Sequence, residues 1–582
     1  MTREPLVIWP LDGLSRVFPH DRPPGNAGAL CRRGWSLAGA RGEYQNFQLG
    51  IHGHLDPQKL QVQASPLFDG RNTIPAGAIH IHWVGLIPVP LDSFDPEGAE
   101  RPDAVPGWYP DPLLDQPLSV NPRIKSATAL CFTLKVARST KAATYRGTVS
   151  VRYEGRRIRT LPLTIEVWPF AIPRRSTIHV TNWFNNAGLV GWHQCEPWSA
   201  RHWRLLDLYA KTMAAYRQDT ILTPTIFSYY YFSRPLPLVD VTRKPDGSYR
   251  FNMRKLERWI ELFDRRGFRL FEMCHLLDYE DIHKAPPFYV HDERRGETIL
   301  YEGISSHSRV YREVVRAFLG HLCPWLEKRG LTDRFLLHIH DEPQPPIWEE
   351  YARFSKYFRR LAPRIRFIDA MGESDLITRH ESQIDIPVPL TMHLESDDYY
   401  RERARAGDDP VWWYTCCGPT GKYANRFVSM PLINGRLLFW QAHEFGVAGF
   451  LHWGYNFWKY TDRPQSDFLN PYRDHTTNWS VGDTCIVYPA RDWRKDQGPN
   501  SSLRYEAMRA GLQDYELLKR LSTLVGDGNQ SHGTRNSAAR RRGKELLKSV
   551  KRFSGSLTEF SRDSASLYRL RRKIGECIST LQ

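Results

Sequence analysis

Long apolar runs are missing from this sequence. No window approaches the roughly 20 apolar residues that a membrane-spanning helix needs. The opening stretch, MTREPLVIWPLDGLSRVFPHDRPP, has neither the basic start nor the uninterrupted apolar segment of a secretory signal. We therefore expect a cytoplasmic protein with no membrane partner.

Paired cysteines with the spacing of a disulfide framework or a zinc site are also missing. The 9 cysteines are odd in number, and none belongs to a C-x-x-C pair. This usage favours a reducing compartment. We interpret the neighbours Cys416 and Cys417 as two thiols in a buried strand end, with a redox centre as the alternative.

The composition excludes an intrinsically disordered chain, because 41% of the residues are hydrophobic and 25% are charged. A length of 582 residues exceeds one ordinary core and predicts two or three domains. The 19 tryptophans and 27 tyrosines are the unusual feature. Their rings suit ligand clefts, although they also build cores.

The formal charge of +16 is concentrated near the C-terminus. Between residues 527 and 582 there are 13 Lys or Arg against 5 Asp or Glu, which gives 13 − 5 = +8. The run ARRRGKELLKSVKR (539–552) is able to bind phosphates. We interpret it as a solvated basic helix face, since no aromatic residues alternate with the basic ones, and nucleic acid is an unlikely partner.

Residues 1–172 show the pattern of β-strands. Alternating or apolar segments at 42–53, 79–87, 127–137, 145–155 and 159–170 are separated by Gly, Pro and Asp turns, with no convincing helix between them. A β-sandwich of two sheets is the natural way to bury such strands. The proline-rich and acidic segment 94–117 predicts a long irregular loop.

From residue 173 the pattern alternates between strand and helix. Eight candidate strands are interleaved with amphipathic segments such as 200–217, 253–267 and 309–330. The expected strands are 177–183, 219–226, 268–274, 334–340, 365–370, 386–392, 410–416 and 447–453. This number predicts a (β/α)₈ TIM-type barrel over 173–525, closed by a helix at 501–521. Residues 526–582 are then a basic helical C-terminal extension.

Two adjacent acids, Asp341 and Glu342, follow the fourth expected strand in the stretch RFLLHIHDEPQPPIWEEY. In (β/α)₈ barrels the chemistry gathers at the carboxyl ends of the strands. A second His-Asp-Glu, with Asp292 and Glu293, lies in FYVHDERRG and is interpreted as a solvated loop with local ion pairs. Position alone is equally compatible with a catalytic pair at 341–342 and with a structural ion pair.

The same strand predicts a possible metal site. His338 and His340 form a His-x-His pair beside an acid, as in some zinc hydrolases. The alternative is a pair of histidines hydrogen-bonded within the barrel wall. His275, His393 and His452 fall near other strand ends, but no third and fourth ligand stands out. We therefore expect no metal and no cofactor.

Aromatic and amide side chains follow the eighth expected strand in GFLHWGYNFWKYTDRP. Sugar faces pack on aromatic rings, and amides bind hydroxyl groups. Phe457 is interpreted as a cap on the barrel, whereas Tyr460 and Asn185 are further candidates around the site. The predicted substrate-binding residues are Asn182, Trp183, His275, His340, Tyr414, Trp453, Tyr455, Asn456 and Trp458.

Several segments together resemble glycoside hydrolase family 123 and the uncharacterised group related to it. The resemblance runs from about residue 5 to residue 520. It rests on ARGEYQNFQLGI, WYPDPLLD, LHIHDEP, WYTCCGPTGKYANRF, GFLHWGYNFW and RYEAMRAGLQDYE. The best-known members are β-N-acetylgalactosaminidases, so the resemblance implies a β-sandwich joined to a (β/α)₈ barrel. It leaves the basic C-terminal segment outside.

The resemblance also implies roles for the acid pair. Members use an adjacent Asp-Glu pair that matches Asp341 and Glu342. The 2-acetamido carbonyl of the substrate would attack the anomeric carbon in a substrate-assisted retaining mechanism, which departs from the usual two-carboxylate scheme. Glu342 would protonate the leaving oxygen and then activate water. Asp341 would accept the amide N–H and stabilise the developing positive charge.

Our leading hypothesis is an exo-acting glycoside hydrolase that removes a β-linked terminal N-acetylhexosamine, with N-acetylgalactosamine favoured, from an oligosaccharide or glycoconjugate. Three alternatives remain open. One is a glycosidase of the same fold that acts on another sugar. The others are a metal-dependent hydrolase that uses His338 and His340, and a carbohydrate-binding protein without catalysis.

Overall fold

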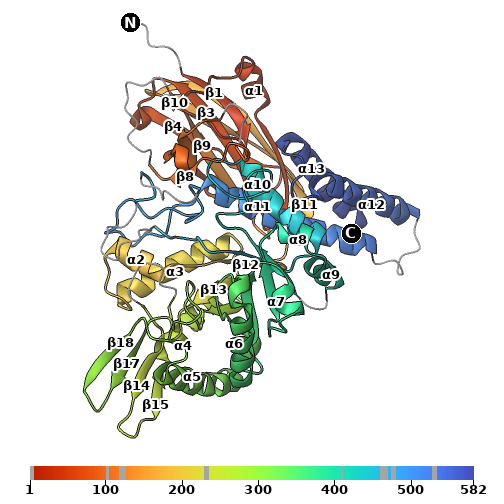
Figure 1. Ribbon diagram of the computed structural model, residues 1–582. Coiled ribbons are helices and arrows are strands. Elements are labelled where there is room, and N and C mark those ends of the chain that lie inside the picture. The colour runs from red at the N-terminus through yellow and green to blue at the C-terminus, as the bar shows by residue number, and fades with distance from the viewer. Residues whose placement is uncertain are drawn as a thin grey trace.

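The structure is a computed structural model (Figure 1). It describes residues 6–99, 104–116, 126–228, 235–407, 410–458, 470–473, 480–526 and 534–582. The N-terminal strands lie at one end, the yellow and green segments lie at the other, and the blue C-terminal helices return to the N-terminal strands. Among the described helices, none has the length and apolar character needed to cross a membrane.

Two sheets form the N-terminal part. One is antiparallel and contains, in spatial order, β1 (Val7–Asp12), β3 (Tyr44–Gly53), β9 (Ser126–Lys135), β7 (Ile79–Val89) and β8 (Gly107–Leu114). The other contains β2 (Trp35–Arg41), β11 (Arg156–Ala171), β10 (Ala143–Tyr153), β5 (Leu67–Phe68) and β6 (Thr73–Ile74), while β4 (Leu60–Ala64) also pairs with β10. Each of the five expected strands coincides with an observed one.

Strand alternation explains how these sheets bury their apolar side chains. Phe47, Leu49 and Ile51 occupy every second position of β3 and are fully buried. They share one hydrophobic core with residues of both sheets. Further members of this core are Leu130, Phe132 and Leu134 of β9, Val149 and Val151 of β10, and Leu161, Leu163 and Ile165 of β11.

The stretch before the first expected strand contains a short helix, α1 (Ala27–Arg33), which buries Ala27 and Cys31, one turn apart. One expectation for this part was wrong. The segment expected to be an irregular loop contains β8, which pairs with β7. Its prolines fit because β8 lies at the edge of the sheet, where its outer side makes, among the described residues, only an isolated bridge, from Pro112 to Ser502. Residues 100–103 and 117 of that segment lie outside the described residues.

Eight short parallel strands form the central part, and each coincides with an expected strand. They are β12 (His179–Asn182), β13 (Thr220–Thr223), β16 (Leu270–Met273), β19 (Phe335–Leu337), β20 (Arg366–Met371), β21 (Ile386–Pro389), β22 (Trp412–Tyr414) and β23 (Gly449–His452). The pairing follows chain order from β13 to β21, and β23 pairs with both β22 and β12. A parallel bridge joins Leu390 to Tyr414, and the Asp219 N–H donates to the Val180 carbonyl at 3.2 Å.

Helices occupy most gaps between these strands. They are α2 (Asn186–His193), α3 (Ala200–Ala215), α4 (Arg254–Arg266), α5 (Arg309–Lys328), α6 (Trp348–Leu361), α7 (Asp375–Thr378), α8 (His393–Ser396), α9 (Asp398–Ala406), α10 (Leu432–Phe445) and α11 (Leu503–Gly526). In α4 the side chains of Leu256, Trp259, Ile260 and Phe263 repeat at helical spacing and are buried. This helix ends at Gly267, whose positive φ of 95° suits a glycine.

A four-stranded sheet was not expected from the sequence. It contains β15 (Tyr249–Asn252), β14 (Asp240–Arg243), β17 (Phe288–Asp292) and β18 (Glu297–Tyr301). The segment FYVHDERRG, interpreted as a solvated loop, is β17 and the turn that follows it. Its alternation of apolar and polar residues is typical of a strand with one buried face.

The C-terminal segment is helical, as expected, but it is not simply a solvated extension. Helix α12 (Thr534–Ser554) buries Ala539, Leu546 and Val550 and exposes the basic side chains of Arg541, Arg542, Lys544, Lys548, Lys551 and Arg552. Helix α13 (Ser564–Leu581) packs on the N-terminal sheets (Figure 1). A Cβ atom at Gly575 would lie 2.2 Å from the Trp168 ring, so only glycine permits this contact.

Candidate active site

Asp341 and Glu342 open into one cavity of about 110 Å³. They follow β19, which ends at Leu337, three residues before the expected boundary. The φ angle of Glu342 is 43°, a left-handed conformation that is uncommon for a non-glycine residue. This turn replaces the alternation of a strand, in which neighbouring side chains point to opposite faces. The cavity is lined by Trp183, Asp341, Glu342, Ala370, Tyr414, Cys416, Cys417, Leu451, Trp453 and Asp483.

The turn after the acid pair is held by local bonds. The side-chain amide of Gln344 donates to the Glu342 carbonyl, and the indole N–H of Trp348 donates to the Pro343 carbonyl, both at 2.9 Å. A short 3₁₀ turn, Pro345–Ile347, leads directly into α6. These bonds, together with the restricted backbone of Pro343, Pro345 and Pro346, hold the chain just beyond the acids.

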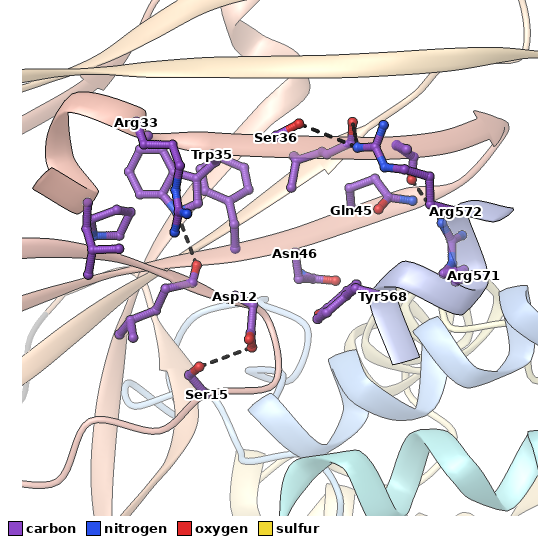
Figure 2. A pocket seen from close by; sticks show the side chains of 17 residues that line it. Asp12, Ser15, Arg33, Trp35, Ser36, Gln45, Asn46, Tyr568, Arg571 and Arg572 are labelled. Atoms are coloured by element: carbon purple, nitrogen blue, oxygen red, sulfur yellow. Dashed lines mark hydrogen bonds between the residues drawn. The ribbon is translucent and has the colours of Figure 1, made fainter. Parts of the chain in front are cut away.

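A larger cavity of about 550 Å³ lies between β2, β3 and α13 (Figure 2). Three of its charged groups, Asp12, Arg571 and Arg572, already have partners, and Arg572 donates to Glu166 at 2.7 Å. Asp12 accepts hydrogen bonds from the Leu14 N–H and the Ser15 hydroxyl, and Arg571 donates to Glu43 and Asp514 at 2.6 Å each. The smaller cavity, where two carboxyl groups converge, is the better candidate for chemistry.

The acid pair lies in an electrostatically unfavourable place. Burial, together with the negative charges of Glu342 and Asp369, raises the pKa of Asp341 well above its ordinary value. The Nε2 atom of His275 lies 3.9 Å from Asp341 Oδ1. The Tyr414 hydroxyl donates a hydrogen bond to Glu342. Burial and the charge of Glu342 raise the pKa of Tyr414, so this tyrosine remains a donor.

A buried polar layer supports the floor of the cavity. Glu272 accepts hydrogen bonds from the Thr181 hydroxyl at 3.1 Å and from the Trp183 indole N–H at 2.9 Å. Burial raises the pKa of Glu272 to about 7. The His338 Nδ1 atom lies 3.0 Å from Asp369 Oδ1, and the Tyr351 hydroxyl donates to the same carboxylate. These bonds fix the ring of Trp183 and the segment that leads to the acids.

The two histidines predicted to bind substrate differ in position. The ring of His275 meets Trp183 edge to face at 5.4 Å and borders Asp341. His340 is buried and does not line the cavity, because its Nδ1 atom bonds to the Asp278 carbonyl at 2.7 Å. Burial lowers the pKa of both histidines below the ordinary value.

The predicted aromatic wall is only partly present. Trp183, Tyr414 and Trp453 line the cavity. Tyr455 and Trp458 instead belong to the main hydrophobic core, where the indole N–H of Trp458 donates to the Val487 carbonyl at 3.1 Å. The ring of Phe457 is buried, which agrees with its interpretation as a cap. Tyr460 lies outside the described residues.

The two predicted amides are structural. Asn456 exchanges two hydrogen bonds with the backbone of Asn185, at 2.7 and 2.9 Å. Asn182 donates to Gln218 at 3.1 Å and accepts from Arg426 at 2.5 Å. Both amides are fully buried, and neither lines the cavity. Their hydrogen-bonding capacity is used to join segments of the fold.

Sequence reasoning missed Asp483 and misjudged the two adjacent cysteines. Asp483 is buried, accepts from the Trp453 indole at 3.1 Å, and lies far beyond the eighth strand in the chain. Burial and the nearby Cys417 raise the pKa of Asp483 well above its ordinary value. Cys417 is exposed in the cavity rather than buried in a strand end. No local pattern marks Asp483, because only tertiary packing brings it to β23.

The fold separates His338 from His340, the pair considered as an alternative metal site. Among the described residues, His338 falls in a possible ligand group with His275 and Asp369, whose ligand atoms lie within 4.8 Å of one another. His340 is not a member. Because His338 already bonds to Asp369, this group also fits an ordinary hydrogen-bonded layer. A second possible group contains the exposed His283 and His307 and the half-buried Glu350.

The family model described as glycoside hydrolase 123, catalytic domain, matches residues 183–521, which is more than half of the chain. The chain belongs to glycoside hydrolase family 123. Membership in family 123 supports hydrolysis of glycosidic bonds as the activity. The matched range contains the acid pair and every residue that lines the smaller cavity.

A solved family 123 structure has a similar fold. It is a glycoside hydrolase from Clostridium perfringens, described for glycolipid glycan hydrolysis, with 15% identity, a TM-score of 0.73, and coverage of 99% of this chain and 98% of that chain. This likeness includes the C-terminal helices. No curated protein matches the chain.

Two other glycoside hydrolase structures are much less similar. A family 39 enzyme from Bacteroides cellulosilyticus WH2 has 9% identity, a TM-score of 0.33, and coverage of 83% of this chain and 82% of that chain. A Bacteroides ovatus family 5 xyloglucanase has 10% identity, a TM-score of 0.30, and coverage of 82% and 98%. Neither carries an argument about this chain.

Proposed function

We propose that this family 123 protein is an exo-acting glycosidase that releases a β-linked terminal N-acetylhexosamine, with N-acetylgalactosamine favoured. The observation that carries the proposal is the convergence of Asp341 and Glu342 on one small cavity with aromatic side chains in its wall. A small cavity suits a single terminal sugar better than a long polysaccharide. The acid pair suits acid–base chemistry at the glycosidic bond.

In the proposed mechanism the substrate supplies its own nucleophile. The acetamido carbonyl attacks the anomeric carbon while Glu342 protonates the leaving oxygen, and Glu342 then takes a proton from water. Asp341 accepts the acetamido N–H and stabilises the positive charge that develops. The raised pKa of Asp341 supports this role. Burial and the neighbouring acids destabilise its carboxylate in the free site, so an N–H donor and a developing positive charge on the substrate would stabilise that carboxylate.

The proposal includes the fold that positions the pair. The order of the eight parallel strands supports a closed (β/α)₈ barrel, with Asp341 and Glu342 beyond the carboxyl end of the fourth strand. The core shared by the two N-terminal sheets supports a β-sandwich. We place the boundaries at residues 1–172, 173–525 and 526–582.

A panel of aryl β-glycosides that differ only in the sugar tests this function. We expect hydrolysis of the substrates that carry a 2-acetamido group and little turnover of the others. Cleavage restricted to sugars without that group would reject the substrate-assisted mechanism while leaving a glycosidase. A glycolipid oligosaccharide belongs in the panel, because the Clostridium perfringens enzyme is described for glycolipid glycan hydrolysis.

The panel also separates the alternatives. The possible ligand group of His275, His338 and Asp369 keeps a metal-dependent hydrolase as a second candidate. Activity that survives exhaustive chelation removes that candidate, whereas loss on chelation and recovery with a divalent metal would replace our proposal. Sugar binding with no turnover of any substrate would favour a carbohydrate-binding protein.

A further inference from the structure

Two sulfur atoms line the candidate active site. Cys416 and Cys417 follow β22, and both belong to the cavity that contains Asp341 and Glu342. Their Sγ atoms lie 3.8 Å apart. All nine cysteines of the chain are described, and Cys417 is the one that is exposed. The proposed hydrolysis makes no use of either thiol.

The loop that carries the sulfurs is fixed. The Cys416 N–H donates to the Gly418 carbonyl at 2.8 Å. The side-chain amide of Asn425, which is fully buried, donates to the carbonyls of Cys416 and Pro419 at 3.0 and 3.1 Å. The thiols are therefore held on the cavity wall rather than on a freely moving loop.

The pair has the electrostatics of a reactive thiol with a donor beside it. A hydrogen bond from the Cys416 thiol lowers the pKa of Cys417, and the same contact, with burial, raises the pKa of Cys416. Partial burial and the negative charge of Glu342 act in the opposite direction on the pKa of Cys417, because both disfavour a thiolate. The thiolate is the nucleophilic form of cysteine, so this arrangement makes Cys417 the reactive member.

We propose that Cys417 is a modification site for soft electrophiles and small disulfides, and that its adduct closes the cavity. The Cys417 thiolate attacks one sulfur of a small disulfide, forms a mixed disulfide, and releases the other half as a thiolate that takes up a proton. With an alkyl halide, a C–S bond forms and halide leaves. The added group occupies the space beside Glu342 in a cavity of only about 110 Å³.

The modification of Cys417 does not depend on the proposed function, whereas the expected loss of glycosidase turnover rests on that function. The folded protein is treated with limiting iodoacetamide, and the labelled peptides are mapped by mass spectrometry. We expect Cys417 to react roughly tenfold faster than the half-buried Cys323, because an exposed, lower-pKa thiol reacts first. Cys323→Ser serves as the matched control and should leave the labelling of Cys417 unchanged.

A second pair of variants tests the role of Cys416. Replacing its thiol in Cys416→Ala removes the donor and should slow the labelling of Cys417, while Cys416→Ser keeps a hydroxyl donor and should slow it less. Preferential labelling of Cys323, or protection of Cys417 in the folded protein but not in urea, would overturn the proposal even if the protein has no glycosidase activity.

Activity supplies the last readout. Each variant is compared with its own untreated sample, so that any change in basal rate cancels. Treated wild type should lose activity in proportion to Cys417 labelling, and treated Cys417→Ser should keep the activity it had. With a small disulfide as the reagent, dithiothreitol should restore the wild type. Full turnover by quantitatively labelled protein would show that the adduct does not close the cavity.

Discussion

The tripeptide His-Asp-Glu occurs twice in this chain, and its two copies have opposite surroundings. At 291–293 the acids are neutralised by arginines and backbone donors. Asp292 accepts from the N–H groups of Arg294 and Arg295 at 3.0 and 3.2 Å. Glu293 accepts from the guanidinium of Arg250 at 2.9 Å.

At 340–342 the contacts are of another kind. Glu342 accepts a hydrogen bond from the Tyr414 hydroxyl, and the Nε2 atom of His275 lies 3.9 Å from Asp341 Oδ1. Burial and the neighbouring acids Glu342 and Asp369 raise the pKa of Asp341. The same tripeptide thus lies in a hairpin with paired charges at 291–293 and places two carboxyl groups in one cavity at 340–342. Perturbed acids in a cavity are typical of functional sites.

The largest expected difference between the copies is in catalysis. Glu342→Gln removes the proton donor and should lower kcat/KM roughly 10²–10⁴-fold. Glu293→Gln is the matched control, since it changes the same residue type in the same tripeptide but lies in a hairpin. It should leave the rate unchanged with a 2-acetamido aryl glycoside. Similar rates for both variants would remove the distinction between the two copies.

The buried polar layer beneath the copy at 340–342 should show a pH effect on stability. The pKa of Glu272 is about 7 in the folded protein, above the ordinary value of 4.5 expected in the unfolded chain. The folded state therefore binds the proton more tightly, and its advantage is present at low pH and is lost as pH rises through about 7. Relative to Glu272→Gln, wild type should lose roughly 2 kcal/mol of unfolding free energy between about pH 5.5 and pH 8.

Urea unfolding of both proteins at the two pH values measures this difference. Glutamine can still accept from Thr181 and Trp183, so the hydrogen bonds remain in the variant. A difference between the two proteins that stays constant with pH would mean that Glu272 has an ordinary affinity for protons.

The smallest effect is a difference in the stability of the two aspartate variants. Asp341→Asn removes a carboxyl group whose ionisation is disfavoured in the folded state, and should stabilise the protein by about 1 kcal/mol at neutral pH. Asp292→Asn keeps an acceptor for the two N–H groups and loses only a half-exposed ion pair with Arg243 at 3.8 Å. Its stability should change by less than about 0.5 kcal/mol. Thermal melting distinguishes the two, and destabilisation by Asp341→Asn would contradict our account.

Most strands of the fold could be predicted because local sequence patterns indicate them. Period-two alternation located β3 and β10, and short apolar runs located the eight parallel strands. The acid pair was found because it follows one of these runs directly. The hairpin of β17 and β18 was missed, since its charged turn residues concealed a strand whose apolar side chains alternate.

Which residues line the cavity could not be predicted, because this depends on whether each side chain points into the cavity or into the core. Trp453 and Trp458 are five positions apart in one aromatic stretch, yet Trp453 lines the cavity and Trp458 lies in the core. Aromatic residues suit both places, so composition does not separate them. Asp483 reaches the cavity through a contact with Trp453, and such a contact leaves no trace in the local sequence.

The ion pair between Glu43 and Arg571 joins residues 528 positions apart in the chain. A ribosome exposes the first strands long before it reaches the last helix. A carboxylate that is buried without its partner is strongly destabilising. The sheet that contains β2 and β11 therefore lacks its α13 contacts until the last helix is made, and a chain truncated before α13 leaves Glu43 without Arg571.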